Sequence, residues 1–163
     1  MVDLIEEIQN VIKDFSNELS KEKIQLVFTS SQEEPIFVNA DKVRIFEVIS
    51  NLLGNAIKFT TKEAGRSITI KAEKIDGQAS VSIKDTGPGI RPEIEPKLFS
   101  KFVTNSSGGT GIGLFISKSI VEAHGGSIRA ENNTDGKGAT FKFSLPLDEQ
   151  TPPRSMYGVE ILL

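Results

Sequence analysis

The chain contains no cysteine, no tryptophan and a single histidine among its 163 residues. Without cysteine there is no disulfide, no thiolate metal site and no cysteine nucleophile. No apolar run approaches the roughly 20 residues that cross a bilayer, and the first residues, MVDLIEE, are acidic where a secretory signal would be basic. We therefore expect a cytoplasmic domain with no direct membrane contact, so that any longer parent protein would meet a membrane elsewhere.

A strong net charge of either sign is missing as well. The 19 Lys and Arg residues nearly balance the 22 Asp and Glu residues, for a formal net charge of -3. This balance gives no broad cationic field for nucleic acid or anionic lipid. Hydrophobic residues make up 37% of the chain and charged residues 25%, which is typical of a soluble globular protein. The length favours one domain, which must hold any anionic ligand by local contacts.

Apolar residues at helical spacing predict three helices. The first covers residues 3–20 and is amphipathic. The second follows Asp41, a favourable N-cap residue, and runs to Phe59. The third extends from about residue 112 to 124 and stops at Gly125-Gly126, which suit a left-handed C-cap.

Strand signals complete the fold prediction. The expected strands are residues 24–28, 35–38, 67–73, 79–84, 127–131 and 139–145. Pro35 restricts the second of these to an edge, and Asp76-Gly77 predicts an antiparallel hairpin. The sum is an α+β fold, a two-layer α/β sandwich in which helices cover one face of a mixed sheet. Residues 85–113 form an unusually long Gly-, Pro-, Ser- and Thr-rich stretch, which favours a functional lid.

A polar ridge follows the second helix. Its members, spaced by three, four, four and three residues, are Arg44, Glu47, Asn51, Asn55 and Lys58. A solvated helix face is the ordinary explanation, yet Asn is a poor helix former, and Gly54 costs about 1 kcal/mol relative to Ala. Close approach of a ligand would explain Gly54. An amide oxygen can ligate Mg²⁺, and Lys58 could reach phosphates. The ridge alone leaves both interpretations open.

Two glycine-containing segments suggest a nucleotide. Residues 85–90, DTGPGI, follow a predicted strand; the carboxylate could accept a hydrogen bond from the exocyclic amine of adenine, although a plain turn would use the same residues. Residues 108–114, GGTGIGL, open the third helix and expose backbone N–H groups, which suits a polyphosphate. The segment does not follow a strand as in a Rossmann fold, and no Gly-Lys-Ser/Thr follows as in a P-loop.

Taken in order, these segments resemble the histidine kinase catalytic domain. NLLGNAIKF at residues 51–59, DTGPG at 85–89 and GTGIGL at 109–114 look like its N, G1 and G2 boxes. LFSKF at 98–102 looks like its F box, and GATF at 138–141 is similar to its last glycine motif. Each box is weak alone, but five in order are a strong signal.

The resemblance covers residues 1–147, with 1–20 as a connecting helix and 148–163 as a tail or linker. It implies the Bergerat ATP-binding fold, shared with gyrase-type, Hsp90-type and MutL-type ATPases. It also implies ATP and Mg²⁺ as cofactors.

Roles carried over from the family fall on named positions. Asn55 would be the Mg²⁺ ligand, Asp85 the carboxylate that reads adenine, and Phe59 an adenine-side contact. Lys58 and Lys101 would contact phosphates, and Asn51 and Lys58 are the expected catalytic residues. Phe99 and Phe102 would anchor the lid. The remaining expected nucleotide contacts are Asn51, Gly87, Gly89, Ile90, Phe102, Gly109, Thr110, Gly111, Ile112, Gly113, Leu114 and Thr140.

Asn51 separates the branches of this superfamily. In the gyrase and Hsp90 branches a glutamate at this position, four residues before the Mg²⁺ asparagine, activates water for hydrolysis. An amide is no general base near neutral pH. The resemblance therefore favours donation of the γ-phosphoryl group to an external histidine. Two alternatives remain: an anti-sigma-type module that phosphorylates Ser or sequesters a partner, and a hydrolysing Bergerat ATPase, against which Asn51 argues.

The chain departs from the family in lacking a phosphoacceptor. His124 stands at a predicted helix end, where a C-terminal cap favoured by the helix dipole is the better interpretation. The expected partners are therefore a dimerisation domain of the same kinase that carries the acceptor histidine, and a response regulator or receiver domain. Residues 158–163, GVEILL, resemble the first strand of a receiver domain, although a truncated or foreign tail is the stronger interpretation.

Overall fold

The computed structural model describes residues 1–30, 34–60, 65–104 and 109–148. Its main layer is a five-stranded sheet in the order β2-β4-β5-β7-β6. The strands are β2 (Gln25–Ser30), β4 (Ser67–Ile75), β5 (Gln78–Asp85), β6 (Ser127–Asn132) and β7 (Ala139–Pro146). β2 runs parallel to β4, and the other neighbours are antiparallel. The predicted mixed sheet is confirmed.

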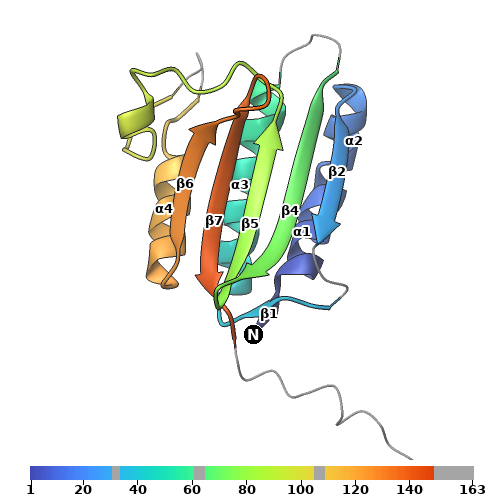
Figure 1. Ribbon diagram of the computed structural model, residues 1–163, viewed down its shortest axis with the longest axis vertical. Helices are drawn as coiled ribbons and strands as arrows, with labels where there is room; N and C mark the ends of the chain where they lie inside the picture. Colours follow the sequence, from blue (N-terminus) through green and yellow to red (C-terminus); the bar gives the residue numbers. More distant parts are fainter. Residues whose placement is uncertain (31–33, 61–64, 105–108, 149–163) are drawn as a thin grey trace, which may run out of the picture.

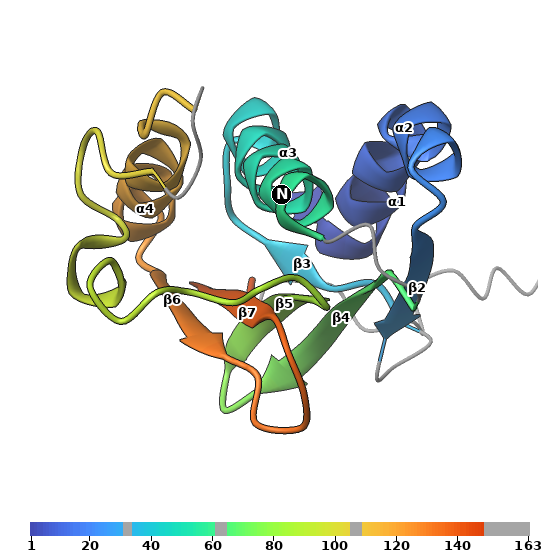
Figure 2. The ribbon, with the colours of Figure 1, turned by 90° about the horizontal axis from the view of Figure 1, so that it is seen from above.

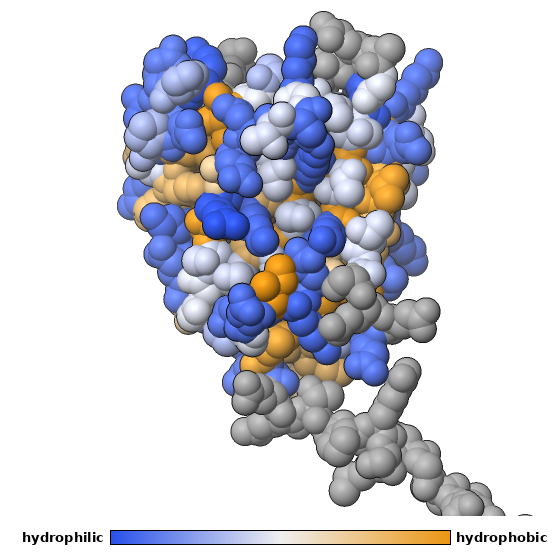
Figure 3. All heavy atoms as spheres, in the orientation of Figure 1, coloured by the Kyte–Doolittle hydropathy of each residue, from blue (hydrophilic) through white to orange (hydrophobic). Residues whose placement is uncertain are grey.

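Helices form the second layer. They are α1 (Leu4–Asp14), α2 (Ser16–Lys21), α3 (Lys42–Phe59) and α4 (Gly113–Ala123), with a short 3₁₀ turn, η1 (Glu95–Lys97). The four α-helices lie on one face of the sheet, with α3 over its centre and α4 beside β6 (Figures 1 and 2). The opposite face, turned toward the viewer in Figure 3, is mainly hydrophilic. The two-layer α/β sandwich is therefore confirmed.

The first predicted helix is wrong in detail. Residues 3–20 form two helices instead of one, because the chain breaks at Phe15, whose backbone adopts φ -91° and ψ 1°. A Cβ atom on Gly54 of α3 would lie 3.6 Å from the Phe15 ring, so the ring packs against α3 at the break. Asp3 precedes α1 as its N-cap and accepts a hydrogen bond from the backbone N–H of Ile5.

The second predicted strand also differs. β3 (Phe37–Val38) does not join the main sheet as an edge; it pairs with β1 (Val2–Asp3) in a separate two-stranded sheet. The N-terminal residues are thus built into the domain. The role of residues 1–20 as a connection to another domain stays a prediction.

The main core lies between the sheet and the helices. It includes Ile45, Ile49, Leu52 and Leu53 of α3, Ile68 and Ile70 of β4, Ile83 of β5 and Phe143 of β7, together with Leu4, Ile8 and Val11 of α1. These side chains are 0% or 1% exposed. The bounds predicted for α3 and its Asp41 cap are confirmed: the Asp41 carboxylate accepts hydrogen bonds from Val43 and Arg44.

The predicted turns are confirmed where residue chemistry requires them. Asp76 and Gly77 adopt φ 50° and 75° and join β4 to β5, while Gly125 adopts φ 77° after α4. A second small core forms under the segment that follows β5, from Ile90, Ile94, Leu98 and Ala139. The predicted receiver-like residues 158–163 lie outside the described residues.

Candidate functional site

A cavity of about 280 Å³ opens between α3, the loop after β5, the segment after η1 and the start of α4. This volume is close to the lower end of small-molecule sites, about 300–1,000 Å³. The predicted site residues that line it are Asn51, Asn55, Lys58, Phe59, Asp85, Gly89, Ile90, Gly109, Thr110, Gly111, Gly113 and Leu114. The fold therefore brings together three segments that are far apart in the sequence.

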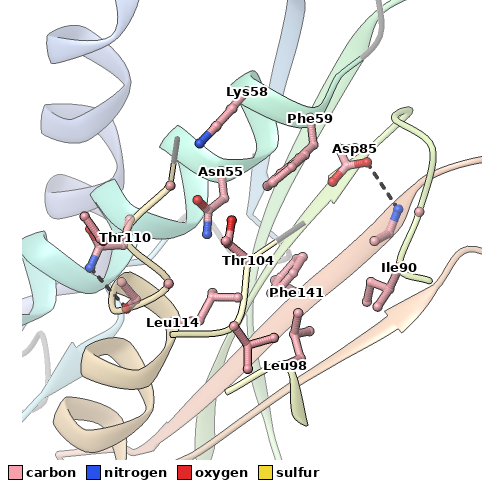
Figure 4. A pocket seen from close by; sticks show the side chains of 17 residues that line it. Asn55, Lys58, Phe59, Asp85, Ile90, Leu98, Thr104, Thr110, Leu114 and Phe141 are labelled. Atoms are coloured by element: carbon pink, nitrogen blue, oxygen red, sulfur yellow. Dashed lines mark hydrogen bonds between the residues drawn. The ribbon is translucent and has the colours of Figure 1, made fainter. Parts of the chain in front are cut away.

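The polar ridge of α3 divides into two parts. Asn51, Asn55 and Lys58 line the cavity, whereas Arg44 and Glu47 pair with each other at 2.9 Å near the start of the helix. Figure 4 shows Asn55 and Lys58 projecting from α3 toward the turn that carries Thr110. Within the described residues, no hydrogen bond or ion pair engages the Asn55 amide or the Lys58 ammonium group. Both groups are therefore available to a ligand.

Asp85, the last residue of β5, lies at the opposite end of the cavity, beside Phe59 and Ile90 (Figure 4). Its side chain is buried, and Oδ1 accepts hydrogen bonds from the backbone N–H groups of Gly87 at 2.9 Å and Ala139 at 3.2 Å. In the described part of the chain, no hydrogen bond reaches Oδ2, the oxygen left for a ligand. Burial raises the pKa of this carboxyl group, and the two backbone hydrogen bonds oppose that rise.

The turn before α4 is held in place by the segment after η1. Gly111 adopts φ 66°, and its carbonyl oxygen accepts a hydrogen bond from the Phe102 N–H at 2.8 Å. A Cβ atom on Gly111 would lie 2.7 Å from the Phe102 Cα, so the close approach requires glycine. In the part of the chain that the structure describes, no side chain caps the N-terminus of α4. Its first backbone N–H groups are therefore available to an anion.

Five predicted contacts do not line the cavity in this structure: Gly87, Lys101, Phe102, Ile112 and Thr140. The Lys101 ammonium group lies 4.9 Å from the centre of the Phe115 ring. The Phe102 residue is 74% exposed. The prediction that Phe102 anchors the lid together with Phe99 is therefore wrong. Phe99 does pack, edge to face with Phe141 at 6.5 Å between ring centroids.

The ligand explanation for Gly54 is wrong. Gly54 is not among the lining residues, and its nearest non-local neighbour is the ring of Phe15. The glycine therefore faces α1 and not the cavity. The distance of 3.6 Å leaves room for a methyl group.

Sequence reasoning missed several lining residues. These are Leu98, Val103, Thr104, Ala139 and Phe141, which come from the segment after η1 and from β7. All but Thr104 are apolar. Of the apolar residues, Leu98 and Phe141 lie below Asn55 and Asp85 in Figure 4. The signal for Phe141 was its alternation with the polar residues of β7; the position of Val103 had no sequence signal.

Both ring nitrogens of the single histidine contact backbone groups. His124 Nε2 accepts a hydrogen bond from the Asp41 N–H at 3.1 Å, and Nδ1 lies 2.7 Å from the Ile120 carbonyl oxygen. This geometry requires a neutral ring with its proton on Nδ1. His124 is the C-cap residue of α4, as predicted. It joins the end of α4 to the start of α3.

Metal clusters and membrane-spanning helices are both missing from the described chain. The described residues contain no group of three or more His, Cys, Asp or Glu side chains that could hold a metal ion. Among the helices of the same residues, none has the length and apolar character required to cross a membrane.

Comparison with known proteins agrees with this geometry. Residues 40–149 match the model of a family described as histidine kinase-, DNA gyrase B-, and HSP90-like ATPase. The sensor protein FixL of Bradyrhizobium diazoefficiens is 37% identical over 131 residues, which are 80% of this chain and 26% of FixL. The sensor protein KdpD of Clostridium acetobutylicum is 41% identical over 152 residues, 89% of this chain and 16% of KdpD. The chain therefore spans about a quarter or less of these relatives.

Solved structures give the same result at the level of the fold. The catalytic domain of the histidine kinase ThkA superimposes with a TM-score of 0.80 at 36% identity, covering 89% of this chain and 93% of that domain. The mycobacterial sensor histidine kinase MprB gives a TM-score of 0.78 at 29% identity, covering 90% of this chain and 95% of that chain. The protein therefore belongs to the family of histidine kinase-, DNA gyrase B- and HSP90-like ATPases, as an ATP-binding catalytic domain of the sensor histidine kinase type.

Proposed function

We propose that this domain binds Mg-ATP in the cavity and donates the γ-phosphoryl group to a histidine on a separate dimerisation domain of the same kinase. One observation carries the proposal. Among the described residues that line the cavity, the single carboxylate is Asp85, whereas the end that faces residues 109–113 offers two amides and an ammonium group. Adenine would occupy the first end and the triphosphate the second.

The adenine end suits a base with an exocyclic amine. Asp85 Oδ2 is the acceptor available there, and the rings of Phe59 and Phe141 with Ile90 and Leu98 supply apolar contact. A partly apolar pocket with one directed polar group fixes the orientation of a ligand. We infer that Asp85 reads the amine of adenine.

The phosphate end suits a triphosphate with a divalent cation. The uncapped N–H groups at the start of α4 and the Lys58 ammonium group favour anions. The unengaged amide oxygen of Asn55 fits one Mg²⁺ ligand, and the phosphates and water would supply the others, as is usual for Mg²⁺. Bound Mg²⁺ would neutralise charge on the phosphates. We expect Lys101 to reach the phosphates only after a change in the segment that carries it.

Phosphotransfer is favoured over hydrolysis because, among the described lining residues, no general base faces the phosphate end. Asn51 stands there, and its amide nitrogen lies 3.3 Å from the Ser117 hydroxyl oxygen and 3.5 Å from the Gly113 carbonyl oxygen. An amide engaged in this way does not deprotonate water. An external nucleophile is then required.

Relatives support the partners in this proposal. ThkA, 34% identical to this chain, has been solved in complex with the response regulator protein TrrA. ShkA, 30% identical, has been solved as a full-length protein in complex with AMPPNP. We propose that this chain works in the cytoplasm, with a dimerisation domain that accepts the phosphoryl group and a response regulator or receiver domain to which the group is then transferred.

Phosphoryl transfer in trans tests the proposal. The chain is incubated with radiolabelled ATP, Mg²⁺ and a dimerisation domain that carries an acceptor histidine. We expect acid-labile phosphate on that domain and none when its acceptor histidine is replaced by glutamine. Label on serine, or none on any acceptor domain despite ATP binding, would contradict the assignment.

The chain alone serves as an internal control. Because both ring nitrogens of His124 are engaged with backbone groups, we expect no acid-labile phosphate on this chain when the partner domain is left out. Acid-labile phosphate mapped to His124 would overturn the trans mechanism.

A further inference from the structure

Two adjacent asparagines, Asn132 and Asn133, contact the loop of residues 85–90 and do not line the cavity. Asn132 is the last residue of β6, and Asn133 begins the turn to β7. Asn133 Nδ2 donates to the carbonyl oxygens of Asp85 at 2.8 Å and Lys137 at 3.0 Å. Its Oδ1 accepts from the Thr140 hydroxyl group at 2.7 Å. One side chain therefore fixes the backbone of Asp85 to the β6–β7 turn.

Asn132 holds the other end of the same loop. Its Oδ1 accepts from the Ile90 N–H at 2.6 Å, and its Nδ2 donates to the Ile90 carbonyl oxygen at 3.0 Å. The amide thus pairs with both backbone groups of Ile90, as a neighbouring strand would. Residues 85 and 90 are clamped by consecutive side chains.

Close packing also restricts the loop of residues 85–90 where it contacts Asn132 and the β6–β7 turn. A Cβ atom on Gly138 would overlap the Asp85 carbonyl oxygen, and one on Gly89 would lie 2.6 Å from Asn132 Oδ1. The N–H of Ala139, the first residue of β7 after this turn, also donates to Asp85 Oδ1. The position of the Asp85 carboxylate is therefore set by the β6–β7 turn as much as by β5.

We propose that Asn132 and Asn133 are positioning residues for base selection, which hold Asp85 so that Oδ2 meets the exocyclic amine of adenine. This inference rests on the proposed function and deepens it. A hydrogen bond to a base edge selects only when donor and acceptor are held within about 0.5 Å of the productive geometry. Neither asparagine touches the base; each acts through Asp85 or Ile90. Thr140 then acts through Asn133 and not as a direct contact.

Isosteric variants test the clamp. Asn132→Asp and Asn133→Asp keep an accepting oxygen and replace the donating nitrogen by a second oxygen, which faces a carbonyl oxygen of Ile90 or Asp85. Asp135→Asn is the matched control, because Asp135 lies in the same turn but pairs with Lys84 at the surface. Calorimetry measures the affinities for ATP and for inosine triphosphate, which carries a carbonyl oxygen in place of the amine.

We expect the parent chain and Asp135→Asn to prefer ATP over inosine triphosphate. In the two clamp variants this preference should fall by about tenfold, the scale of one or two hydrogen bonds. The ratio of affinities is informative because an added negative charge repels the triphosphate, which both ligands share, and so leaves the ratio unchanged. A purely structural turn would also leave it unchanged.

The outcomes separate the two claims. If the parent shows no preference for ATP, adenine reading by Asp85 fails and the clamp fails with it. If the parent prefers ATP and the folded variants keep the same ratio, the clamp alone is overturned. Should either Asp variant fail to give a cooperative unfolding transition, Thr140→Val decides, since it removes the hydroxyl that orients Asn133 without adding charge. A reduced ratio in that variant supports the clamp, and a parental ratio overturns it.

Discussion

The amide nitrogen of Asn51 lies 3.3 Å from the hydroxyl oxygen of Ser117, which is completely buried between α3 and α4. The pair connects the helix that carries Asn55 and Lys58 with the helix whose N-terminus faces the cavity. We infer that Asn51 fixes the spacing of the two helices. We also propose that it occupies the place from which a carboxylate could activate water.

Replacing Asn51 by glutamate is expected to convert the site toward hydrolysis. The carboxylate would stand one helical turn before Asn55 on the same ridge, and the Ser117 hydroxyl could donate to it. A positioned general base contributes about 10²–10⁴-fold in rate. Phosphate release at saturating ATP measures the gain, with Asn51→Gln as a control of equal length and no charge. Equal rates in the two folded, saturated variants would show that water access and not the missing base prevents hydrolysis.

Asn55→Ala should abolish the Mg²⁺-dependent part of nucleotide affinity and leave the fold intact. The Asn55 side chain lines the cavity and contributes no hydrogen bond to the described scaffold. Calorimetric titration with ATP, with and without Mg²⁺, gives the measurement. Asn17→Ala, a change of the same type at an exposed position of α2, is the control. An unaltered Mg²⁺ dependence in Asn55→Ala would remove Asn55 from the metal site.

Asp85→Asn should separate stability from function. Burial raises the pKa of Asp85 above its ordinary value of 3.8, so the folded chain holds this proton more tightly than the unfolded chain. The stability that the protonated group provides is present below pH 3.8 and is lost as pH rises through the raised pKa. Asparagine stays neutral and keeps an oxygen for the Gly87 and Ala139 N–H groups. The free energy of unfolding of the Asp85→Asn chain, relative to that of the parent chain, should therefore increase as pH rises from 3.8 through the raised pKa of Asp85. At higher pH the difference between the two chains should stay constant.

Nucleotide binding by the Asp85→Asn chain should weaken. The introduced amide, if its oxygen accepts both backbone hydrogen bonds, would present its nitrogen to the adenine amine, and two donors would then face each other. Urea unfolding at several pH values and ATP titration of the same samples check both halves. An Asp85→Asn chain that binds ATP as tightly as the parent would disprove adenine reading by the carboxylate.

Gly54→Ala should stabilise the domain by about 1 kcal/mol, because glycine in a helix interior is less favourable than alanine by that amount. The new methyl group would meet the Phe15 ring at 3.6 Å, an ordinary contact distance, on the side of α3 that faces α1. Urea unfolding measures the gain, and ATP affinity should not change. The contrasting variant is Gly126→Ala, whose Cβ atom would overlap the Ser144 carbonyl oxygen and should destabilise the fold. A destabilised Gly54→Ala chain would show that α1 cannot accommodate the added methyl group.

The sequence by itself determined the features that depend on neighbouring residues. Asp41 caps α3, Asp76-Gly77 forms the hairpin turn and Gly125 ends α4, because each conformation is set by the chemistry of one or two residues. The order of the glycine motifs also indicated which segments would meet, and twelve of the predicted residues do line one cavity.

Tertiary structure alone decided the features that depend on distant partners. The break at Phe15 arises where its ring packs against Gly54, and β3 pairs with β1 and not with the main sheet. Asn132 and Asn133 look like ordinary turn residues in the sequence, yet their amides hold a loop 42 and 48 residues away along the chain. Hydrophobic periodicity and capping residues predict the local backbone conformation. These contacts instead depend on the packing of elements that meet only when the chain is folded.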